Sequence, residues 1–427
     1  MNWPMFGIVE TVGLIIMLGA VIQVVMGVFT ITSRAADSQR KSAAELESFK
    51  RRAGILLEEA KFERDRTESS WNGKRKFRID RRVVENETGD ICSFYLVPHD
   101  GRPLPSFHPG QFLTFELPIP DEPQPVVRCY SLSDSPLEDY YRVSIKRQGP
   151  PPKAPEGTPA GRSSNYFHDQ LKEGDIVEAM APAGGFYLDE ESERGVVLIG
   201  GGVGLTPVVS MLNTLIARGS NRDIWFFYGI RNREEHAMAE HLREMDRAHA
   251  NVHVVICYSL PDDTCQEGVD YNRAGYVSVE LFKSLLESSN YEFYICGPPP
   301  MMDMVIRDLE EWGVPEEHIN FEAFGPATVK KTQEPASTAG ESKTIEVVFA
   351  KSDKTLNWVT ASGTLLEFGE ENGIKMNSGC RSGGCGTCLT ALKEGEIEYV
   401  HRPGKKPEAG SCLVCIARPA GRVVLDA

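Results

Sequence analysis

Five of the ten cysteines lie between Cys380 and Cys415. Three of them stand in SGCRSGGCGTC with C-x4-C-x2-C spacing, which places three thiolates of a [2Fe–2S] cluster on one turn. The glycines of this turn let it curl, so that backbone N–H groups can reach the cluster sulfurs. A structural zinc site or disulfides are the alternatives, but zinc sites usually use two C-x2-C pairs. The predicted ligands are Cys380, Cys385, Cys388 and one of Cys412 and Cys415.

A second pattern, GVVLIGGGVGLTPVVSML at 195–212, predicts a strand, a glycine turn and a helix. Thr206 suits the helix N-cap and Pro207 its first turn. Helix N-termini attract phosphate, and glycine permits close backbone approach. A strand in YICGPPPMMDMV ends at Cys296 before a further helix, and ligands of open α/β sheets bind at such strand ends. The predicted nucleotide-binding residues are Gly200, Gly201, Gly202, Gly204, Thr206, Gly297 and Pro298.

The elements that must hold these motifs divide the chain into several domains. Short β-rich runs at 76–190, separated by Gly, Pro and Asp clusters, predict an antiparallel β-barrel. At 191–326 strand and helix patterns alternate, which predicts a doubly wound α/β domain. Residues 327–342 carry few large apolar side chains and predict a linker. A small α+β domain at 343–427 then holds the cysteines, so the fold class is multidomain.

The uncharged run from Thr11 to Thr32 is long enough to cross a bilayer core of ~30 Å as a transmembrane helix. A cleaved signal peptide is the alternative, although no Lys or Arg precedes the run and its length exceeds a usual signal core. Basic residues follow the run, which favours a cytoplasmic location for the rest of the chain. We expect a single-pass membrane anchor in the lipid bilayer at 1–34 and a helical stalk at 35–75. The net charge of -15 disfavours a general nucleic-acid binder.

The segments GVVLIGGGVGLTP, YICGPPPMM and RCYSLSDSP together resemble the ferredoxin–NADP reductase superfamily. The resemblance implies that the glycine turn faces the pyrophosphate of the nicotinamide cofactor. It also implies that Gly297 and Pro298 line the nicotinamide position and that Cys296 lies beside the hydride path. A merely packed thiol is the alternative for Cys296.

The same resemblance assigns a flavin to the barrel. It implies that Arg128 meets the flavin phosphate, that Tyr130 stacks on the isoalloxazine ring, and that Ser131 hydrogen-bonds near the reactive nitrogen. These residue types suit phosphate and a planar π system. Ser164 in GRSSNYFHD matches a phosphate-contacting serine, and it could also be a helix N-cap. Glu322 and Phe324 in EAFGP match a segment beside the flavin.

The segments SNYFHD and EAFGP look most like the reductase module of flavohaemoglobins, which implies FAD rather than FMN and favours NADH. Arg231 and Arg233 keep NADPH open, because a 2′-phosphate would attract them. The resemblance covers about 76–427. Its module order is that of phthalate dioxygenase reductases and phenylacetyl-coenzyme A oxygenase reductases, with a ferredoxin-like last domain. The family pattern of Cys, one residue and Ala selects Cys415 as the fourth ligand.

NAD(P)H delivers two electrons as hydride, whereas a [2Fe–2S] centre accepts one at a time, so a flavin must stand between them. We therefore expect an NAD(P)H-dependent flavin and iron–sulfur reductase that passes electrons to a protein acceptor. A tether favours an acceptor in the same bilayer, such as an oxygenase, hydroxylase or desaturase. The alternatives are a subunit of a quinone-reducing complex and a membrane-tethered redox sensor.

Overall fold

The computed structural model describes most of the chain from residue 71 onward. Its described residues are 13, 17–19, 23, 26, 71, 73–120, 122, 125–150, 160–324, 344–379, 381, 383, 386–400, 403 and 407–427. Most of the expected anchor and stalk, and the whole linker at 327–342, lie outside them, as do Cys380 and Cys385. Among the helices of this described part, none has both the length and the apolar character that a membrane crossing requires.

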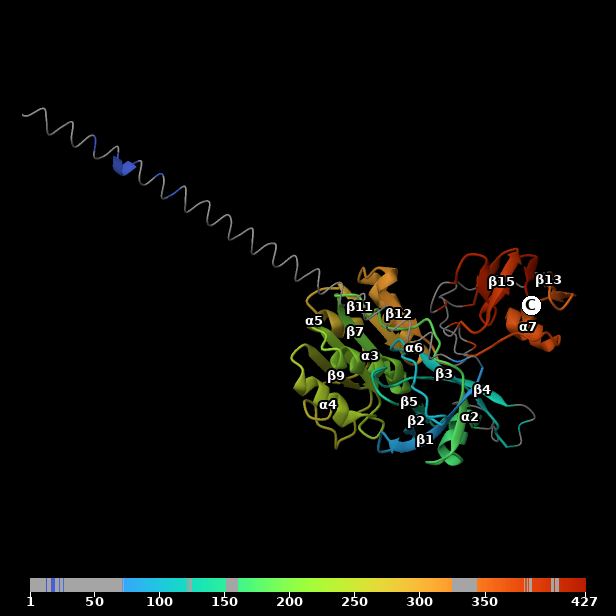
Figure 1. Ribbon diagram of the computed structural model, residues 1–427, viewed down its shortest axis with the longest axis horizontal. Helices are drawn as coiled ribbons and strands as arrows, with labels where there is room; N and C mark the ends of the chain where they lie inside the picture. The colour runs from blue at the N-terminus through green and yellow to red at the C-terminus, as the bar shows by residue number, and fades with distance from the viewer. Residues whose placement is uncertain are drawn as a thin grey trace, which may run out of the picture. The chain divides into compact units, whose positions relative to one another are not determined.

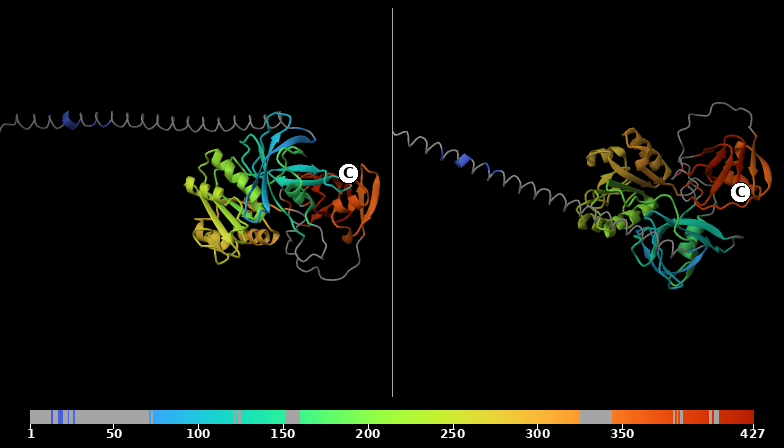
Figure 2. Two further views of the ribbon diagram at one scale, coloured as in Figure 1. Left: turned by 90° about the horizontal axis from the view of Figure 1, so that it is seen from below. Right: turned by 45° about the horizontal axis from the view of Figure 1, so that its top comes forward.

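The first described domain is a six-stranded antiparallel barrel, coloured blue to green in Figure 2. The strand order is β4-β3-β6-β1-β2-β5, and a bridge between Leu132 and Val143 joins the two outer strands and closes the barrel. Buried aromatic side chains such as Phe94 and Phe115 fill its interior. The elements are β1 (Arg75–Val84), β2 (Ile91–Pro98), β3 (Phe112–Leu117), β4 (Val126–Ser131), β5 (Tyr141–Lys146), α2 (Arg162–Asp169) and β6 (Ile176–Ala179).

The second domain is a parallel sheet with the order β10-β9-β8-β7-β11-β12. Alternate residues of β7 face two cores: Leu198 packs in the core that includes α3 and α4, and Ile199 in the core that includes α5 and α6. Helices therefore cover both faces, as the strand and helix alternation predicts (Figure 1). The strands are β7 (Gly195–Gly201), β8 (Ile224–Ile230), β9 (Val252–Tyr258), β10 (Arg273–Ala274), β11 (Tyr291–Cys296) and β12 (Ile319–Glu322). The helices are η1 (Gly202–Gly204), α3 (Leu205–Ala217), α4 (Ala239–Ala248), α5 (Val279–Leu285), α6 (Pro299–Glu311) and η2 (Glu316–His318).

The last domain, red in Figure 1, is built on a five-stranded mixed sheet with the order β14-β13-β19-β15-β17, beside the pair β16-β18. Helix α7 begins with a capping box in which Thr364 and Glu367 bond each other's backbone N–H. The elements are β13 (Ile345–Phe349), β14 (Lys354–Trp358), η3 (Thr360–Ser362), α7 (Leu365–Glu371), β15 (Leu389–Glu394), β16 (Ile397–Tyr399), β17 (Ser411–Leu413), β18 (Ala417–Pro419) and β19 (Val423–Leu425).

Candidate functional site

The two glycine motifs of the parallel sheet meet at its carboxyl edge. Cys296, the last residue of β11, pairs in register with Gly200 of β7. A Cβ on Gly204 would fall on the carbonyl of Cys296 and lie 2.7 Å from the backbone nitrogen of Gly297. A Cβ on Gly297 would lie 3.1 Å from the Cα of Gly201. Glycine is thus required at Gly204 and Gly297 by the close approach of two backbones.

The turn itself offers room for a ligand. Gly202 has φ +53°, and a Cβ there would meet no atom within 4 Å. The 3-10 turn η1 begins at this open position and continues into α3, so its first backbone N–H groups stand at the start of the combined helix. Such N–H groups attract a phosphate, which fits the pyrophosphate of a nicotinamide cofactor.

Two predicted helix caps are wrong. Helix α3 begins at Leu205 with Gly204 as its N-cap, and the Thr206 hydroxyl donates to the carbonyl of Val203 at 3.1 Å. The glycine turn continues directly into the helix, so the N-cap lies two residues before the predicted Thr206. Helix α2 likewise has Gly161 as its N-cap, so Ser164 lies inside its first turn. The Ser164 hydroxyl accepts from the backbone N–H of Gln148 at 3.2 Å instead.

Cys296 is fully buried between the ends of two neighbouring strands. It pairs with Gly200 of β7 on one side and with Glu322 of β12 on the other. Burial raises the pKa of its thiol well above the usual value, and the nearby Glu322 carboxyl raises it further. The thiol is therefore neutral at physiological pH. Its role beside the hydride path stays a prediction.

The flavin motif RCYSLSDSP runs along β4 and ends beyond it. The Tyr130 hydroxyl donates to Ser163 on α2 at 3.1 Å, and burial raises the pKa of Tyr130 to about 12. The ring of Tyr130 packs edge-on against Phe167 at 5.3 Å between centroids. Ser131 is buried, whereas the exposed Arg128 has a guanidinium that donates to the carbonyl of Val127 at 2.7 Å. An exposed cation and a held aromatic ring on one strand suit the phosphate and ring of a flavin.

The segment EAFGP, at the end of the nucleotide domain, places its two predicted residues differently. Glu322 ends β12 and is buried beside Cys296. Phe324 follows the strand and is 37% exposed, one of the large apolar side chains that solvent reaches. The structure therefore brings Glu322 to the nucleotide edge of the sheet and leaves Phe324 at the surface.

Two of the predicted metal ligands lie side by side. The Sγ atoms of Cys388 and Cys415 are 3.0 Å apart, although 27 residues separate them in the chain. Cys415 follows β17, and its neighbour Ile416 packs against Gly383 of the cysteine turn. Cys412 lies within β17, opposite Thr390 of β15, and burial raises the pKa of its thiol to about 12.

The cysteine turn has the backbone that a cluster-binding loop needs. Gly383 and Gly386 have φ values of +74° and +71°, which L side chains rarely adopt. Arg381, at φ +56°, forms two hydrogen bonds to Glu370 of α7, at 2.6 and 2.9 Å. Cys388 of this turn, with the thiol of Cys415 beside it, fits two of the four ligands of a [2Fe–2S] cluster. Cys380 and Cys385, the other two predicted ligands, lie outside the described residues.

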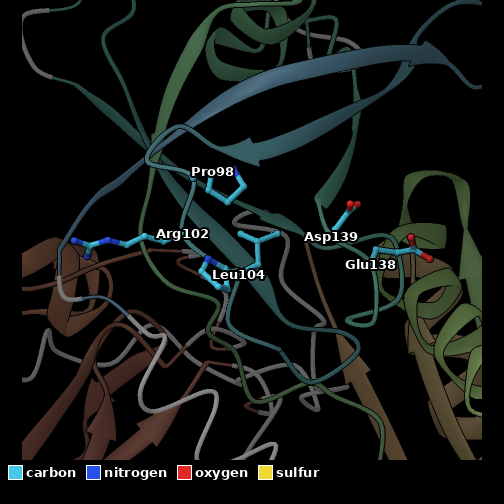
Figure 3. A pocket seen from close by; sticks show the side chains of 7 residues that line it. Pro98, Arg102, Leu104, Glu138 and Asp139 are labelled. Atoms are coloured by element: carbon cyan, nitrogen blue, oxygen red, sulfur yellow. The ribbon is translucent and has the colours of Figure 1, made fainter.

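A surface pocket of about 420 Å³ lies on the barrel, apart from both glycine motifs. Figure 3 shows Arg102 and Leu104 on one side of it and Glu138 and Asp139 on another. None of the predicted site residues lines this pocket, so it is assigned no part in cofactor binding.

Sequence reasoning missed two polar side chains that the structure places at the site. Ser163 holds the hydroxyl of Tyr130, and its only sequence signal is its position beside Ser164. Asp134 belongs to the flavin motif but bonds to Asn213, 79 residues away. No local pattern could have indicated that pair.

Comparison with known proteins matches two families. Residues 198–307 match the family of oxidoreductase NAD-binding domains, which spans the glycine turn and the Cys296 motif. Residues 349–420 match the family of 2Fe-2S iron-sulfur cluster binding domains.

Several individual proteins are also similar. A flavohemoprotein of Bacillus thuringiensis is 42% identical over 260 residues, which is 61% of this chain and 63% of that protein. The chain thus spans less than two thirds of the length of the curated relatives it matches. A solved FAD/NAD-binding domain of nitric oxide dioxygenase from Vibrio cholerae is 31% identical, with a TM-score of 0.52, over 59% of this chain and 99% of that one. The solved phthalate dioxygenase reductase is 28% identical, with a TM-score of 0.50, over 83% of this chain and 98% of that one. This chain is therefore an oxidoreductase in which an NAD-binding domain is followed by a 2Fe-2S cluster binding domain, as in phthalate dioxygenase reductase.

Proposed function

We propose that the protein takes hydride from NADH and passes single electrons through FAD and a [2Fe–2S] cluster to a protein acceptor. The observation that carries this proposal is the close contact of Gly204 with Cys296 and Gly297 at the carboxyl edge of the sheet. That contact forms a glycine-lined nucleotide site in a chain that also carries a cluster-binding domain.

FAD is the flavin that the similar Vibrio cholerae domain is described as binding. In this chain Arg128 would meet its phosphates, Tyr130 and Ser131 its ring, and Ser164 a phosphate at the start of α2. When bound, FAD accepts a hydride from NADH and releases the two electrons one at a time. The chain's part is to hold nicotinamide and flavin in register and to exclude water from the contact.

NADH is favoured over NADPH by the ion pairs after β8. The Arg233 guanidinium lies 2.6 Å from Asp270 and also donates to the carbonyl of Thr264. Its charge is thus already neutralised by a protein carboxylate. Arg231 is largely exposed and lies 3.3 Å from Glu235. A 2′-phosphate would have to compete with both carboxylates, whereas a ribose hydroxyl would not.

The acceptor of the electrons is an oxygenase-type enzyme in this proposal, because the similar phthalate dioxygenase reductase is named for such a partner. The apolar run at residues 11–32 supports a single-pass anchor with the catalytic domains on the cytoplasmic side. A membrane-bound hydroxylase, desaturase or oxygenase would then meet the cluster domain at a raised local concentration.

Anaerobic mixing of the purified protein with NADH and, separately, with NADPH, followed over time, tests this function. Absorbance bands of the flavin and of the cluster are followed separately, and electron paramagnetic resonance counts the reduced cluster. We expect NADH to reduce the flavin first and the cluster next, with NADPH much slower. If neither nucleotide reduces protein that contains both cofactors, the proposed function is wrong.

A further inference from the structure

Asp134 of the flavin motif bonds to the nucleotide domain through both its side chain and its backbone. Asp134 stands three residues after Ser131, and its carboxylate accepts from the side-chain amide of Asn213 on α3 at 2.7 Å. Its backbone carbonyl accepts from the hydroxyl of Ser210, also on α3, at 2.7 Å. Ser210 and Asn213 are three positions apart, so they lie on one face of the helix.

The barrel holds this carboxylate firmly. Arg142 on β5 lies 3.1 Å from it, and both side chains are about nine-tenths buried. The Tyr140 hydroxyl donates to the same carboxylate at 3.0 Å. The Arg142 guanidinium also donates to Ser133, the residue before Asp134. Because hydrogen bonds are directional, these contacts together fix the orientation of the carboxylate.

The nucleotide domain holds its own side of the contact in the same way. His241 on α4 lies 2.8 Å from the amide oxygen of Asn213, which fixes that amide toward Asp134. Ser210 is fully buried on α3. Both partners of Asp134 lie on α3, the helix whose N-cap is Gly204 of the glycine turn.

We propose that Asp134 is a positioning residue that sets the distance between the flavin ring and the nicotinamide, through Asn213 and Ser210 on α3. The proposal rests on the proposed function. Tyr130, Ser131 and Asp134 lie on one short segment of the barrel. The glycine turn leads directly into α3, and α3 also holds Ser210 and Asn213, the two residues that bond to Asp134. A shift at this contact moves the two reacting rings relative to each other, and hydride transfer is steeply sensitive to such a shift.

A second contact keeps the domains together when the first is weakened. Backbone N–H groups of Thr88 and Met238 donate to the carbonyls of Glu234 and Glu85 at 3.2 and 3.0 Å. These bonds join the turn between β1 and β2 to the segment before α4. Loss of the Asn213 bond should therefore change the position of α3 relative to the flavin motif without separating the two domains.

The test uses Asn213→Ala in the full chain, because this change leaves the buried pair of Asp134 and Arg142 intact. Asn213→Gln keeps an amide and serves as the conservative variant. Thr214→Val is the matched control, since the hydroxyl of Thr214 bonds the carbonyl of Ser210 within α3 itself, at 2.7 Å. Anaerobic stopped-flow over a range of NADH concentrations separates the rate of flavin reduction from the Kd for NADH. The long-wavelength charge-transfer absorbance of the complex reports the contact of the two rings.

We expect Asn213→Ala to slow flavin reduction at saturating NADH about tenfold. We expect no difference between Asn213→Ala and Thr214→Val in the Kd for NADH, the FAD content or the melting temperature. The charge-transfer absorbance of Asn213→Ala should be weaker than that of Thr214→Val. Asn213→Gln should recover part of the rate of flavin reduction. An unchanged rate and absorbance in Asn213→Ala would overturn the proposal, as would a loss that only follows lost FAD. If the wild-type protein itself fails to accept hydride, the proposed function fails instead.

Discussion

At the scale of single residues, the two candidates for the fourth metal ligand differ in their surroundings. Cys412 and Cys415 are both buried and are three residues apart. The Sγ atom of Cys415 lies 3.0 Å from that of Cys388, whereas Cys412 lies within β17 and pairs with Thr390 of β15. The turn after β17 thus presents one thiol to the cysteine turn.

We predict that Cys415→Ser loses most of the cluster and keeps NADH-dependent flavin reduction, because only a ligand holds the metal. Cys412→Ser should keep both, at a modest cost in stability. Electron paramagnetic resonance of the reduced proteins, with iron content per chain, measures the difference. A full cluster signal in Cys415→Ser would return the fourth position to Cys412.

His236 is a buried residue whose environment makes stability depend on pH. Its Nδ1 lies 2.9 Å from the Tyr258 hydroxyl, and burial lowers the pKa of His236 to about 4. The unfolded chain, with a histidine pKa near 6.5, binds a proton first as the pH falls. The contribution of neutral His236 to the free energy of unfolding is therefore fully present above pH ~6.5, and it is lost as the pH falls toward ~4.

We predict that the free energy of unfolding falls by about 3 kcal/mol more between pH 6.5 and pH 4 in the wild-type protein than in His236→Gln. Thermal or denaturant unfolding at several pH values measures the two slopes. Equal slopes would mean that His236 accepts its proton in the folded state without cost.

At the scale of elements, the glycine turn between β7 and α3 makes a prediction about packing. Gly204→Ala would place a Cβ on the carbonyl of Cys296, so β11 and the turn would have to move apart. We expect a stability loss of ~1–3 kcal/mol, as for other overpacked sites, together with strongly weakened NADH binding. Gly421→Ala is the control, because a Cβ there would meet no atom within 4 Å.

Calorimetry and an NADH titration of the two variants check this expectation. Cluster and flavin content should stay at the wild-type level in both. Wild-type NADH affinity in Gly204→Ala would show that the turn and β11 can separate without harm to the nucleotide site.

Helix caps show the limit of reading elements from sequence. Thr206 and Ser164 have the side chains that N-caps prefer, yet glycines cap both α3 and α2. The position of each helix start is set by how the preceding turn packs on its neighbours. Local preference is weaker than that packing, so the helices were predictable and their first residues were not.

At the scale of the whole molecule, the proposed anchor has a consequence for electron delivery. Deletion of residues 1–34 should leave reduction of ferricyanide by NADH unchanged, because the catalytic domains do not need the bilayer. Delivery to an acceptor in membranes should fall sharply, since tethering raises the local concentration of the cluster domain. Equal delivery by the truncated and full proteins at matched concentration would argue against a delivery role for the anchor.

The sequence by itself determined the types and order of the three described domains and the cofactors that they bind. Spacing of cysteines and glycines is a local property, and strand and helix patterns follow periodicity within each segment. The tertiary structure decided which distant residues meet. It placed Cys388 beside Cys415, Gly204 against Cys296, and Asp134 against Asn213. Such contacts depend on how whole elements pack in three dimensions, and no local pattern in one sequence encodes which distant residues will meet.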